Sequence, residues 1–579
     1  MSRNEEVAAL FEELADRLAA QDDPYRPRAY RRAADNIRAH PEPIEAVAAE
    51  GEEALHAIEG VGEAIASKVI EYLETGRIEA LEAAREELPV DIVALTRVEG
   101  IGPKTVGDLY EALGVTDLDD LEAAAQAGEI RELHGYGAKT EQNILEHLPF
   151  ARQADERTLL ADARPLADDL VEYLTDAEAV RRCAPAGSLR RWRETVGDVD
   201  VLAAGPDPAA VVDRLQAWPD VDDVIEAGTA KASVRARDLR VDLRVVDPDE
   251  FGSALQYFTG SRDHNVGLRT RAVERDLKVN EYGVFDVSDV EDPDAGQRVG
   301  ERIAGETESS VYAALDLPWI PPELREDAGE LDAADEGALP DLVERDDLRG
   351  DLHVHTDWSD GDASLETMVE AAAAAGHDYL GIADHATGPG MVGGVGVPDD
   401  DLLELASAVR EIDATADVDV FAGVEANIDA GGELSVADEV LAALDLVVAS
   451  PHSGLDGDGT DRLVAAAEHP SVDIVGHPSG RLLNRRPGLE LDLDTLAEAA
   501  AANGVALEVN ANPHRLDLWG EAVRRAIDAG ATVAVNTDAH RPGEYDYLRY
   551  GVHAARRGWA ERADVLNSSG ADDVRAFLD

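Results

Sequence analysis

Seven short apolar segments lie between residues 348 and 579, and nearly every one ends in a residue that can bind a metal ion. They are residues 351–355, 380–385, 421–425, 447–452, 474–477, 507–510 and 533–540. Helical patterns separate the segments, and this repetition of strand and helix is typical of a parallel barrel. Such barrels gather their functional groups at the carboxyl ends of the strands. The pattern therefore predicts a barrel with a site at its mouth.

Histidine marks most of these strand ends. Of the 15 histidines in the chain, seven lie near the expected strands: His353, His355, His377, His385, His452, His477 and His540. A lone histidine usually has a structural role, but six of these seven close a strand. Imidazoles mixed with carboxylates suit Zn2+ or Mn2+ better than Mg2+. Such ions generate hydroxide near neutral pH and neutralise a phosphate ester.

This third of the chain resembles the PHP (polymerase and histidinol phosphatase) domain, which implies a distorted (β/α)7 barrel. The resemblance also implies a cluster of up to three metal ions, with Glu425 bridging two of them. Its nine ligands fall on His353, His355, Asp360, His385, Glu425, His452, His477, Asp538 and His540.

A second group of acids stands where another strand is expected to begin. Asp198 and Asp200 precede and enter an apolar run, so the period of two puts both carboxylates on one face. Two acids this close repel each other unless a cation lies between them. Asp242 lies on the polar face of another alternating strand, and three aspartates could hold two Mg2+ or Mn2+ ions for phosphoryl transfer. A solvated strand end in an acidic chain would explain one such pair equally well.

The order of motifs around these acids favours the metal site. Gly-Ser and an arginine pair come first, then Gly-Asp-Val-Asp, then the third aspartate, and then Tyr-Phe-Thr-Gly-Ser at residues 257–261. The series resembles the palm and thumb of the DNA polymerase X family, of which polymerase beta is the familiar member. The resemblance makes Asp198, Asp200 and Asp242 the catalytic carboxylates, with Asp242 helping the primer hydroxyl to react.

The same resemblance assigns residues to the incoming deoxynucleoside triphosphate. They are Gly187, Ser188, Arg191, Gly197, Tyr257, Phe258, Gly260, Asn265 and Arg269. The tyrosine and phenylalanine would flank the sugar, the asparagine would reach the minor-groove edge of the incoming base, and Arg269 would reach the template. Arg262 and His264 depart from the mammalian pattern, which leaves fidelity and sugar selectivity open.

Three Gly-x-Gly turns occur within about 80 residues near the N-terminus. Each lies between helical patterns, and glycines there allow a hairpin whose amides face a phosphate at the start of the next helix. The turns resemble helix-hairpin-helix elements, which hold the DNA backbone without reading bases. The residues expected to contact DNA are Gly60, Gly62, Gly100, Gly102, Lys104, Gly135, Gly137 and Lys139.

The first segment also resembles the small lyase domain of polymerase beta. Lys68 falls where that family has its Schiff-base lysine, which would attack an abasic-site aldehyde as a free amine. Ala64 replaces a second lysine of the pocket, so this site departs from the family pattern. Whether Lys68 supports lyase activity stays open.

The net charge of −70 is unusual for a chain expected to bind DNA. Only five of the 52 basic residues are lysines, and three of those five lie in or just after the glycine turns. An acidic surface that is poor in lysine fits a protein working in molar salt, where the Debye length falls to about 3 Å. We therefore interpret the composition as halophilic.

The single cysteine, Cys183, rules out an intrachain disulfide and suits a reducing compartment. There is no signal-like N-terminus and no uncharged apolar run of about 18 residues. We expect a cytoplasmic protein, monomeric and without a membrane partner.

These features predict a multidomain α+β and α/β protein. The expected domains are a helical lyase-like domain (1–88), fingers with helix-hairpin-helix motifs (89–151), a nucleotidyltransferase palm (152–250), a thumb (251–320), an acidic linker (321–347) and the PHP metallohydrolase domain (348–579).

The expected activity is template-directed synthesis across short gaps in gapped or primed DNA during repair, including base excision repair. The PHP domain would act as a 3'-5' exonuclease, an abasic-site endonuclease or a 3'-phosphatase, and the sequence does not choose among these. Two alternatives remain: a nuclease or phosphatase with feeble polymerisation, and a DNA-binding scaffold with a silent palm.

Overall fold

Apolar residues repeat every three or four positions through the first 150 residues, and that part of the chain is helical in the computed structural model. The structure describes residues 3–578 except for residues 22, 24, 25, 40–43, 50, 57, 59, 99, 134, 238, 294 and 389–394. The chain divides into one unit of Met1–Arg157 with Asn484–Arg486 and a second of Thr158–Leu483 with Pro487–Asp579.

Where the structure describes the first unit, its regular elements are all helices. They are α1 (Arg3–Ala20), α2 (Arg26–Ala39), α3 (Ile44–Ala49), α4 (Glu52–Leu55), α5 (Glu63–Thr75), α6 (Glu79–Glu87), α7 (Ile92–Thr96), α8 (Pro103–Leu113), α9 (Leu118–Ala127), η1 (Ile130–Glu132) and α10 (Ala138–Glu156). Val7, Phe11 and Leu14 form the buried stripe of α1. One apolar core spans α1 to α6, and a second spans α7 to α10. Helix α10 runs through the expected domain boundary at 151/152.

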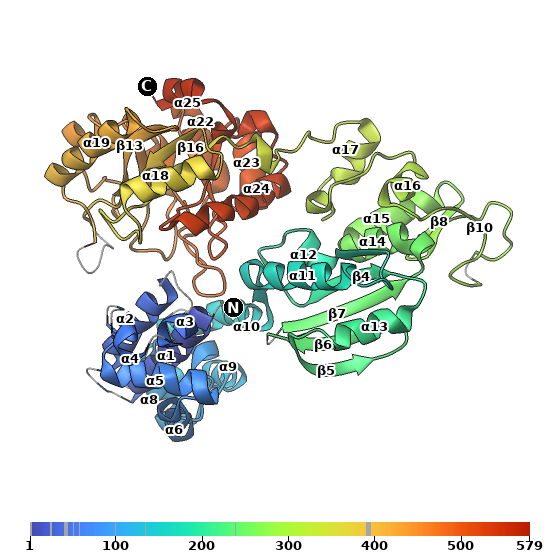
Figure 1. The fold of residues 1–579 in the computed structure, drawn as a ribbon, viewed down its shortest axis with the longest axis horizontal. Helices are drawn as coiled ribbons and strands as arrows, with labels where there is room; N and C mark the ends of the chain where they lie inside the picture. The colour runs from blue at the N-terminus through green and yellow to red at the C-terminus, as the bar shows by residue number, and fades with distance from the viewer. Residues whose placement is uncertain are drawn as a thin grey trace. The chain divides into compact units, whose positions relative to one another are not determined.

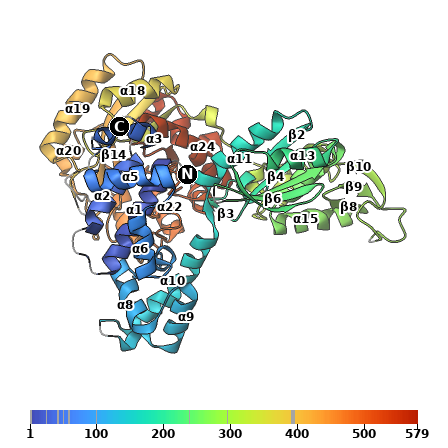
Figure 2. The same cartoon turned by 60° about the horizontal axis from the view of Figure 1, so that its bottom comes forward.

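The second unit begins with a mixed sheet. Its elements are β1 (Thr158–Leu159), α11 (Leu160–Thr175), β2 (Arg182–Pro185), α12 (Gly187–Arg190), β3 (Thr195–Val196), β4 (Val199–Ala204), α13 (Pro208–Gln216), β5 (Val221–Ala227), β6 (Lys231–Ala236), β7 (Leu239–Val246) and η2 (Pro248–Glu250). The strand order is β2-β4-β7-β6-β5, with β4 and β7 parallel. Helices α11 and α13 pack in the core on one face of this sheet (Figure 2).

The segment expected to be the thumb packs on the other face through α14. Its elements are α14 (Phe251–Thr259), α15 (Arg262–Val273), β8 (Leu277–Asn280), β9 (Gly283–Asp286), β10 (Glu301–Ala304), α16 (Glu308–Ala313), η3 (Pro322–Leu324), α17 (Glu330–Glu336) and η4 (Arg345–Asp347). Strands β8, β9 and β10 form an antiparallel sheet.

Residues 321–347, expected to be an acidic linker, are folded. Leu324, Leu331 and Leu342 are buried in one core with thumb residues. The fully buried Arg325 donates to Glu308 of α16 at 2.5 Å. These leucines are few and lie among many Asp and Glu residues, so the composition of the segment gave no sign that it is folded.

The rest of the unit is a barrel, as predicted. Its elements are β11 (Gly350–Val354), α18 (Leu365–Ala374), β12 (Tyr379–Ile382), α19 (Asp399–Asp413), β13 (Asp419–Asn427), α20 (Asp438–Leu441), β14 (Leu446–Ser450), α21 (Thr460–Ala467), β15 (Ile474–Val475), α22 (Leu493–Asn503), β16 (Ala506–Asn510), α23 (Gly520–Asp528), β17 (Val533–Asn536), η5 (Pro542–Tyr547), α24 (Leu548–Arg557), η6 (Arg562–Asp564), η7 (Leu566–Ser568) and α25 (Ala571–Leu578).

All seven barrel strands are parallel and follow the order of the sequence. A bridge between Val354 and Ala539 joins the ends of the first and last strands, so the sheet nearly closes. Helices α18, α19, α22, α23 and α24 surround the strands (Figure 1). Because the strands are parallel, their carboxyl ends meet at one mouth. Among the described residues, no helix is both long enough and apolar enough to cross a bilayer.

Candidate metal centres

The three palm aspartates come together at the edge of the mixed sheet. Asp200 of β4 is directly opposite Asp242 of β7 in the parallel register, and Asp198 precedes β4. Each of the three offers an oxygen within 4.8 Å of the others. The alternation of the two strands produces this convergence, as the sequence predicted. An oxygen-only ligand set of this kind suits Mg2+ or Mn2+.

The electrostatics of this group also favour a cation. Burial, followed by repulsion from Asp198 and Asp242, raises the pKa of Asp200 to about 7. The guanidinium of Arg240 donates to Asp242 from Nε at 3.0 Å, so it supplies positive charge at the same place. A divalent ion would remove the repulsion that disfavours the ionised form of Asp200.

Gly187 is required by the position of Asp200. Its φ is +62°, in the left-handed region, and a Cβ atom there would overlap Oδ2 of Asp200. The glycine thus allows the short helix α12, with Ser188, to approach the aspartates. Gly197 lies between β3 and β4, beside Asp198.

A cavity of about 250 Å³ adjoins the aspartates. Its lining includes Asp200, Asp242, Phe258 and three cations that the sequence analysis missed, Lys231, Arg240 and Arg244. The signal for two of them was present, because Arg240, Asp242 and Arg244 alternate along β7 and share one face. Lys231 could not be placed at the cavity from the sequence, because only the pairing of β6 with β7 shows that it lies opposite Arg244.

The other residues assigned to the nucleotide lie at the junction of α14 and α15. Tyr257 and Phe258 contact each other edge to face, with ring centroids 5.2 Å apart. Asn265 Nδ2 donates to the backbone oxygens of Tyr257 at 2.7 Å and Gly260 at 3.1 Å, and Arg269 Nε donates to Asn265 O. These bonds fix the turn between the helices.

The barrel mouth brings all nine expected PHP ligands together. Glu425 lies at the centre: Oε2 is 2.5 Å from His385 Nδ1, and Oε1 is 3.0 Å from His477 Nε2 and 3.4 Å from both His353 Nε2 and His452 Nε2. A second carboxylate, Asp538, lies 3.0 Å from His355 Nε2.

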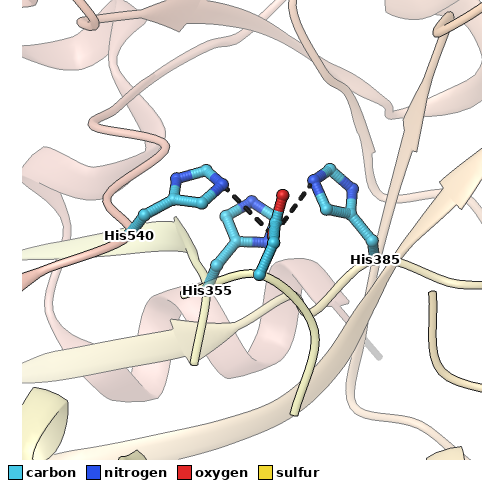
Figure 3. A group of neighbouring side chains, drawn as sticks. His355, His385 and His540 are labelled. Carbon is cyan, nitrogen blue, oxygen red and sulfur yellow. Dashed lines mark ion pairs between the residues drawn. The ribbon is translucent and has the colours of Figure 1, made fainter. Parts of the chain in front are cut away.

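On one side of the cluster, the rings of His355, His385 and His540 converge (Figure 3). The carboxylate of Asp360 lies 3.5 Å from His385 Nε2 and 3.3 Å from His540 Nε2. Three overlapping sets have donor atoms within 4.8 Å of one another: His355, Asp360, His385 and His540; His353, His355 and Glu425; His385, Glu425 and His452. Glu425 belongs to two of the sets, which suits a bridging ligand.

The donor atoms fit a metal cluster. Buried atoms without a hydrogen-bond partner among the described residues include His353 Nε2, both ring nitrogens of His355 and His452, and both oxygens of Glu425. Burial alone would raise the pKa of Glu425, but the adjacent His452, His385 and His353 hold that pKa well below its usual value. Buried polar atoms are costly unless they are paired, and metal ions would pair these.

Backbone strain accompanies the cluster. His477 and Asp538 have φ values of +23° and +56°. Non-glycine residues in the left-handed region are uncommon and gather at functional sites.

Three buried acids behind the ligands were not predicted to have roles. Glu508 Oε1 is 2.8 Å from His353 Nδ1, and its Oε2 accepts the backbone N–H of His477 at 2.7 Å. Asp384 accepts hydrogen bonds from Thr356 in the loop before Asp360, and Asp351 accepts from Thr537 just before Asp538. A role for Glu508 could have been predicted from the sequence, because it is a charged residue within an apolar strand and lies on the same face as Asn510.

The three glycine turns of the first unit share one conformation. Gly60, Gly100 and Gly135 have φ values of +77°, +84° and +97°. In each turn the second glycine is the N-cap of the next helix, α5, α8 or α10, and this residue supplies no side-chain capping bond. Helix N-termini of this kind can bind an anion through their amides, and the predicted contact with DNA phosphate stays a prediction.

Lys68 and Lys139 lie on helices that follow two of these turns. Lys139 is exposed in the first turn of α10, and Lys104 stands at the matching place in α8. Lys68, farther along α5, donates from Nζ to Ala64 O at 3.2 Å. That oxygen belongs to the residue that replaces a lysine in the family pattern.

Models of known families match four parts of the chain. They are a DNA polymerase beta thumb over residues 254–326, a helix-hairpin-helix domain over 2–78, a SAM-like helix-hairpin-helix tandem over 92–148 and a PHP domain over 351–512. The thumb match extends into residues 321–326, in agreement with the folded segment there.

Three relatives are similar to the chain over different lengths. The DNA polymerase/3'-5' exonuclease PolX of Bacillus subtilis (strain 168) is 36% identical over 567 residues, which cover 96% of each chain. DNA polymerase lambda of Rattus norvegicus is 26% identical over 343 residues, 56% of each chain. The probable phosphatase TTE1963 of Caldanaerobacter subterraneus subsp. tengcongensis is 32% identical over 206 residues, which cover 33% of this chain and 75% of that protein.

Proposed function

The chain belongs to the family X DNA polymerases that carry a C-terminal PHP domain, and on this premise we propose that it extends primers at one site and shortens 3' ends at another. The observation that carries the proposal is the presence of two separate ligand sets on one chain. One is the trio of palm aspartates, and the other is the histidine-rich cluster at the barrel mouth. The substrates are gapped or primed DNA and deoxynucleoside triphosphates.

In the palm, Asp198, Asp200 and Asp242 would hold two Mg2+ or Mn2+ ions. Bound there, such ions neutralise phosphate charge and make a hydroxyl more acidic. Ser188, Arg191 and the amides of α12 bind the triphosphate, and Asp242 accepts the proton of the primer hydroxyl. Tyr257 and Phe258 limit the space beside the sugar.

At the barrel mouth, the nine ligands would hold up to three ions of Zn2+ or Mn2+, which supply hydroxide near neutral pH. Glu508 and Asp384 orient the ligands, since each accepts hydrogen bonds from a ligand or from the loop that carries one. We propose a 3'-5' exonuclease as the main activity of this site, because the relative that matches nearly the whole chain is named for it.

The test is one assay on gapped DNA with a labelled primer, in molar KCl with Mg2+ or Mn2+. Asp198→Ala/Asp200→Ala should abolish extension and leave degradation intact. His353→Ala/His355→Ala should abolish degradation and leave extension intact. Matched controls are Asp223→Ala on the exposed strand β5 and His469→Ala on the barrel surface, which should change neither activity. Loss of both activities in either double variant would contradict two independent sites.

A 3'-phosphatase is the second candidate for the barrel site. The similarity to a protein named as a probable phosphatase favours it. A primer ending in a 3'-phosphate separates the two activities: a phosphatase releases inorganic phosphate and leaves the primer length unchanged, whereas an exonuclease releases nucleotides. Cleavage at an abasic site would instead identify the endonuclease.

We further propose that the protein works in short-gap repair in molar salt. The support is the net charge of −70 together with the place of three of the five lysines in or just after the glycine turns. Lyase activity of Lys68 is tested by borohydride trapping on abasic DNA, which Lys68→Ala should abolish. The cytoplasmic location and the monomeric state remain predictions.

A further inference from the structure

Helix α24 of the barrel packs against the palm loop that carries Arg191. The rings of Trp192 in this loop and His553 in α24 are stacked, with centroids 3.6 Å apart and planes 10° from parallel. The guanidinium of Arg164 in α11 lies 4.5 Å from the centroid of the same tryptophan ring. Trp192 has a φ of +55°, so the loop follows an uncommon path where it meets the barrel.

A barrel arginine then reaches both the backbone and the side-chain partner of Arg191. Arg557 Nη1 donates to Arg191 O at 2.9 Å and to Glu326 Oε1 at 3.1 Å. The same carboxylate oxygen accepts from Arg191 Nε at 3.0 Å. Arg191 Nη1 donates to Thr259 O at the end of α14, at 2.7 Å. The guanidinium of Arg191 is therefore held by two partners, Glu326 and Thr259. Arg557 of the barrel contacts one of these partners, Glu326, and the backbone oxygen of Arg191.

Helix α24 also contacts η3, and the barrel contributes residues to the palm core. Glu323, buried in η3, lies 2.7 Å from His553 Nδ1 and accepts from Arg556 Nε at 2.7 Å. Leu516 and Tyr550 of the barrel are buried within the palm core. The burial of these two apolar side chains stabilises the position of α24 against the palm loop.

We propose that Arg557 and His553 of the barrel are positioning residues for nucleotide incorporation, because they hold the loop through which Arg191 meets the triphosphate of the incoming nucleotide. This inference rests on the proposed polymerase function. Arg191 has a half-buried guanidinium that shares Glu326 with Arg557, so a change at either partner alters the direction of the Arg191 side chain. Hydrogen bonds to charged groups are among the stronger and more directional ones. The barrel thus serves synthesis as well as degradation.

The test is a comparison of KM for the nucleotide with kcat during single-nucleotide gap filling by the full chain. Arg557→Ala should raise KM roughly 10-fold, as expected for losing a hydrogen bond to a charged group. Its exonuclease activity on single-stranded DNA should match that of the wild type. Arg575→Ala, an exposed barrel arginine on α25, is the matched control and should leave KM unchanged.

Two further variants separate positioning from folding. His553→Phe keeps a ring against Trp192 and should retain a KM near that of the wild type, whereas His553→Ala should raise it. Arg557→Ala combined with Glu326→Gln should raise KM by less than the product of the two single effects, because the two residues share one of the contacts that each variant removes.

An unchanged KM in Arg557→Ala would overturn the inference, and so would a parallel fall of both activities together with the melting temperature. A wild-type chain that does not extend primers at all would instead refute the proposed function itself. The two failures are therefore distinguishable.

Discussion

The backbone of Gly187 lies so close to the carboxylate of Asp200 that a Cβ atom on residue 187 would overlap Oδ2 of Asp200. The turn at Gly187, which we propose to bind the triphosphate, and the strand that carries the proposed catalytic carboxylate are therefore in close contact. The absence of a side chain at residue 187 therefore determines where the carboxylate of Asp200 can lie.

Gly187→Ala should displace the carboxylate of Asp200 and strain the turn, whose φ is +62°. A displacement of about 1 Å in a catalytic group can cost roughly 100-fold in rate, and we expect a loss of extension of that order. Exonuclease activity should not change. Gly296→Ala, where the added methyl group meets only ordinary contacts, is the control. Gap filling by Gly187→Ala at the wild-type rate would refute this role.

Gly102→Ala should weaken DNA binding by the first unit without destabilising its fold. Its φ of −91° is ordinary and its Cβ direction is open, so the fold does not require glycine there. A methyl group at the start of α8 would instead obstruct an approaching phosphate. We expect DNA affinity to fall roughly 10-fold, the value of a charge-assisted hydrogen bond, with little change in melting temperature.

Gly100→Ala is the contrasting variant, because its φ of +84° makes alanine costly and should lower stability as well. Gln126→Ala on α9 serves as a surface control. If Gly102→Ala bound DNA as the wild type does in a fluorescence-anisotropy titration, the phosphate contact would be excluded.

Glu508→Gln should weaken the barrel site without touching a ligand position. The amide would present a donor where Oε1 and Oε2 now accept from His353, His477, Asn510 and Asn536. Substitution of a residue that orients a metal-ligating histidine typically lowers metal affinity or activity roughly 10- to 100-fold. We expect an exonuclease loss in that range, measured against added Mn2+, with normal extension. Glu498→Gln on the exposed face of α22 is the matched control.

Asp200→Asn should stabilise the metal-free protein in a pH-dependent way. Burial and the adjacent aspartates raise the pKa of Asp200 to about 7 in the folded chain. The pKa of an aspartate in an unfolded chain is about 3.9. Between these values the folded chain keeps a proton that the unfolded chain has released, so this group makes stability fall as pH rises. Asparagine removes the effect.

The gain in melting temperature of Asp200→Asn over the wild type should therefore be full above pH 7, decline as pH falls and vanish near about pH 4. Melting curves recorded with a chelator across this range measure it, with Asp223→Asn on β5 as control. A gain that is the same at both ends of the range would contradict the assigned titration.

Local patterns were sufficient to predict the barrel, the palm acids and the glycine turns. His353, Asp200 and Gly100 each lie within a short motif whose period or turn chemistry determines where the side chain points. The confirmed family and fold agree with those motifs. Contacts between distant residues were not predictable in this way.

The segment 321–347 illustrates the difficulty. Its acidic composition indicates a linker, yet Arg325 and Glu323 are buried in ion pairs. Arg325 pairs with Glu308, 17 positions away, and Glu323 pairs with Arg556, 233 positions away. The stacking of Trp192 on His553 joins residues 361 positions apart, and no local periodicity reports such a contact. Glu508 could have been noticed as a polar residue in an apolar strand, but its partners become known only when the strands are paired.

The most direct measurement of the central claim is the number of transition-metal ions bound per chain after dialysis. The account holds that imidazole ligands at the barrel mouth and aspartates in the palm form separate cation sites. When the protein is loaded with Zn2+, the wild type and Asp198→Ala/Asp200→Ala should retain the same Zn2+ content, up to three ions per chain, while His353→Ala/His355→Ala should lose most of it. Equal retention by the histidine variant, or loss of the metal in the aspartate variant, would contradict the account.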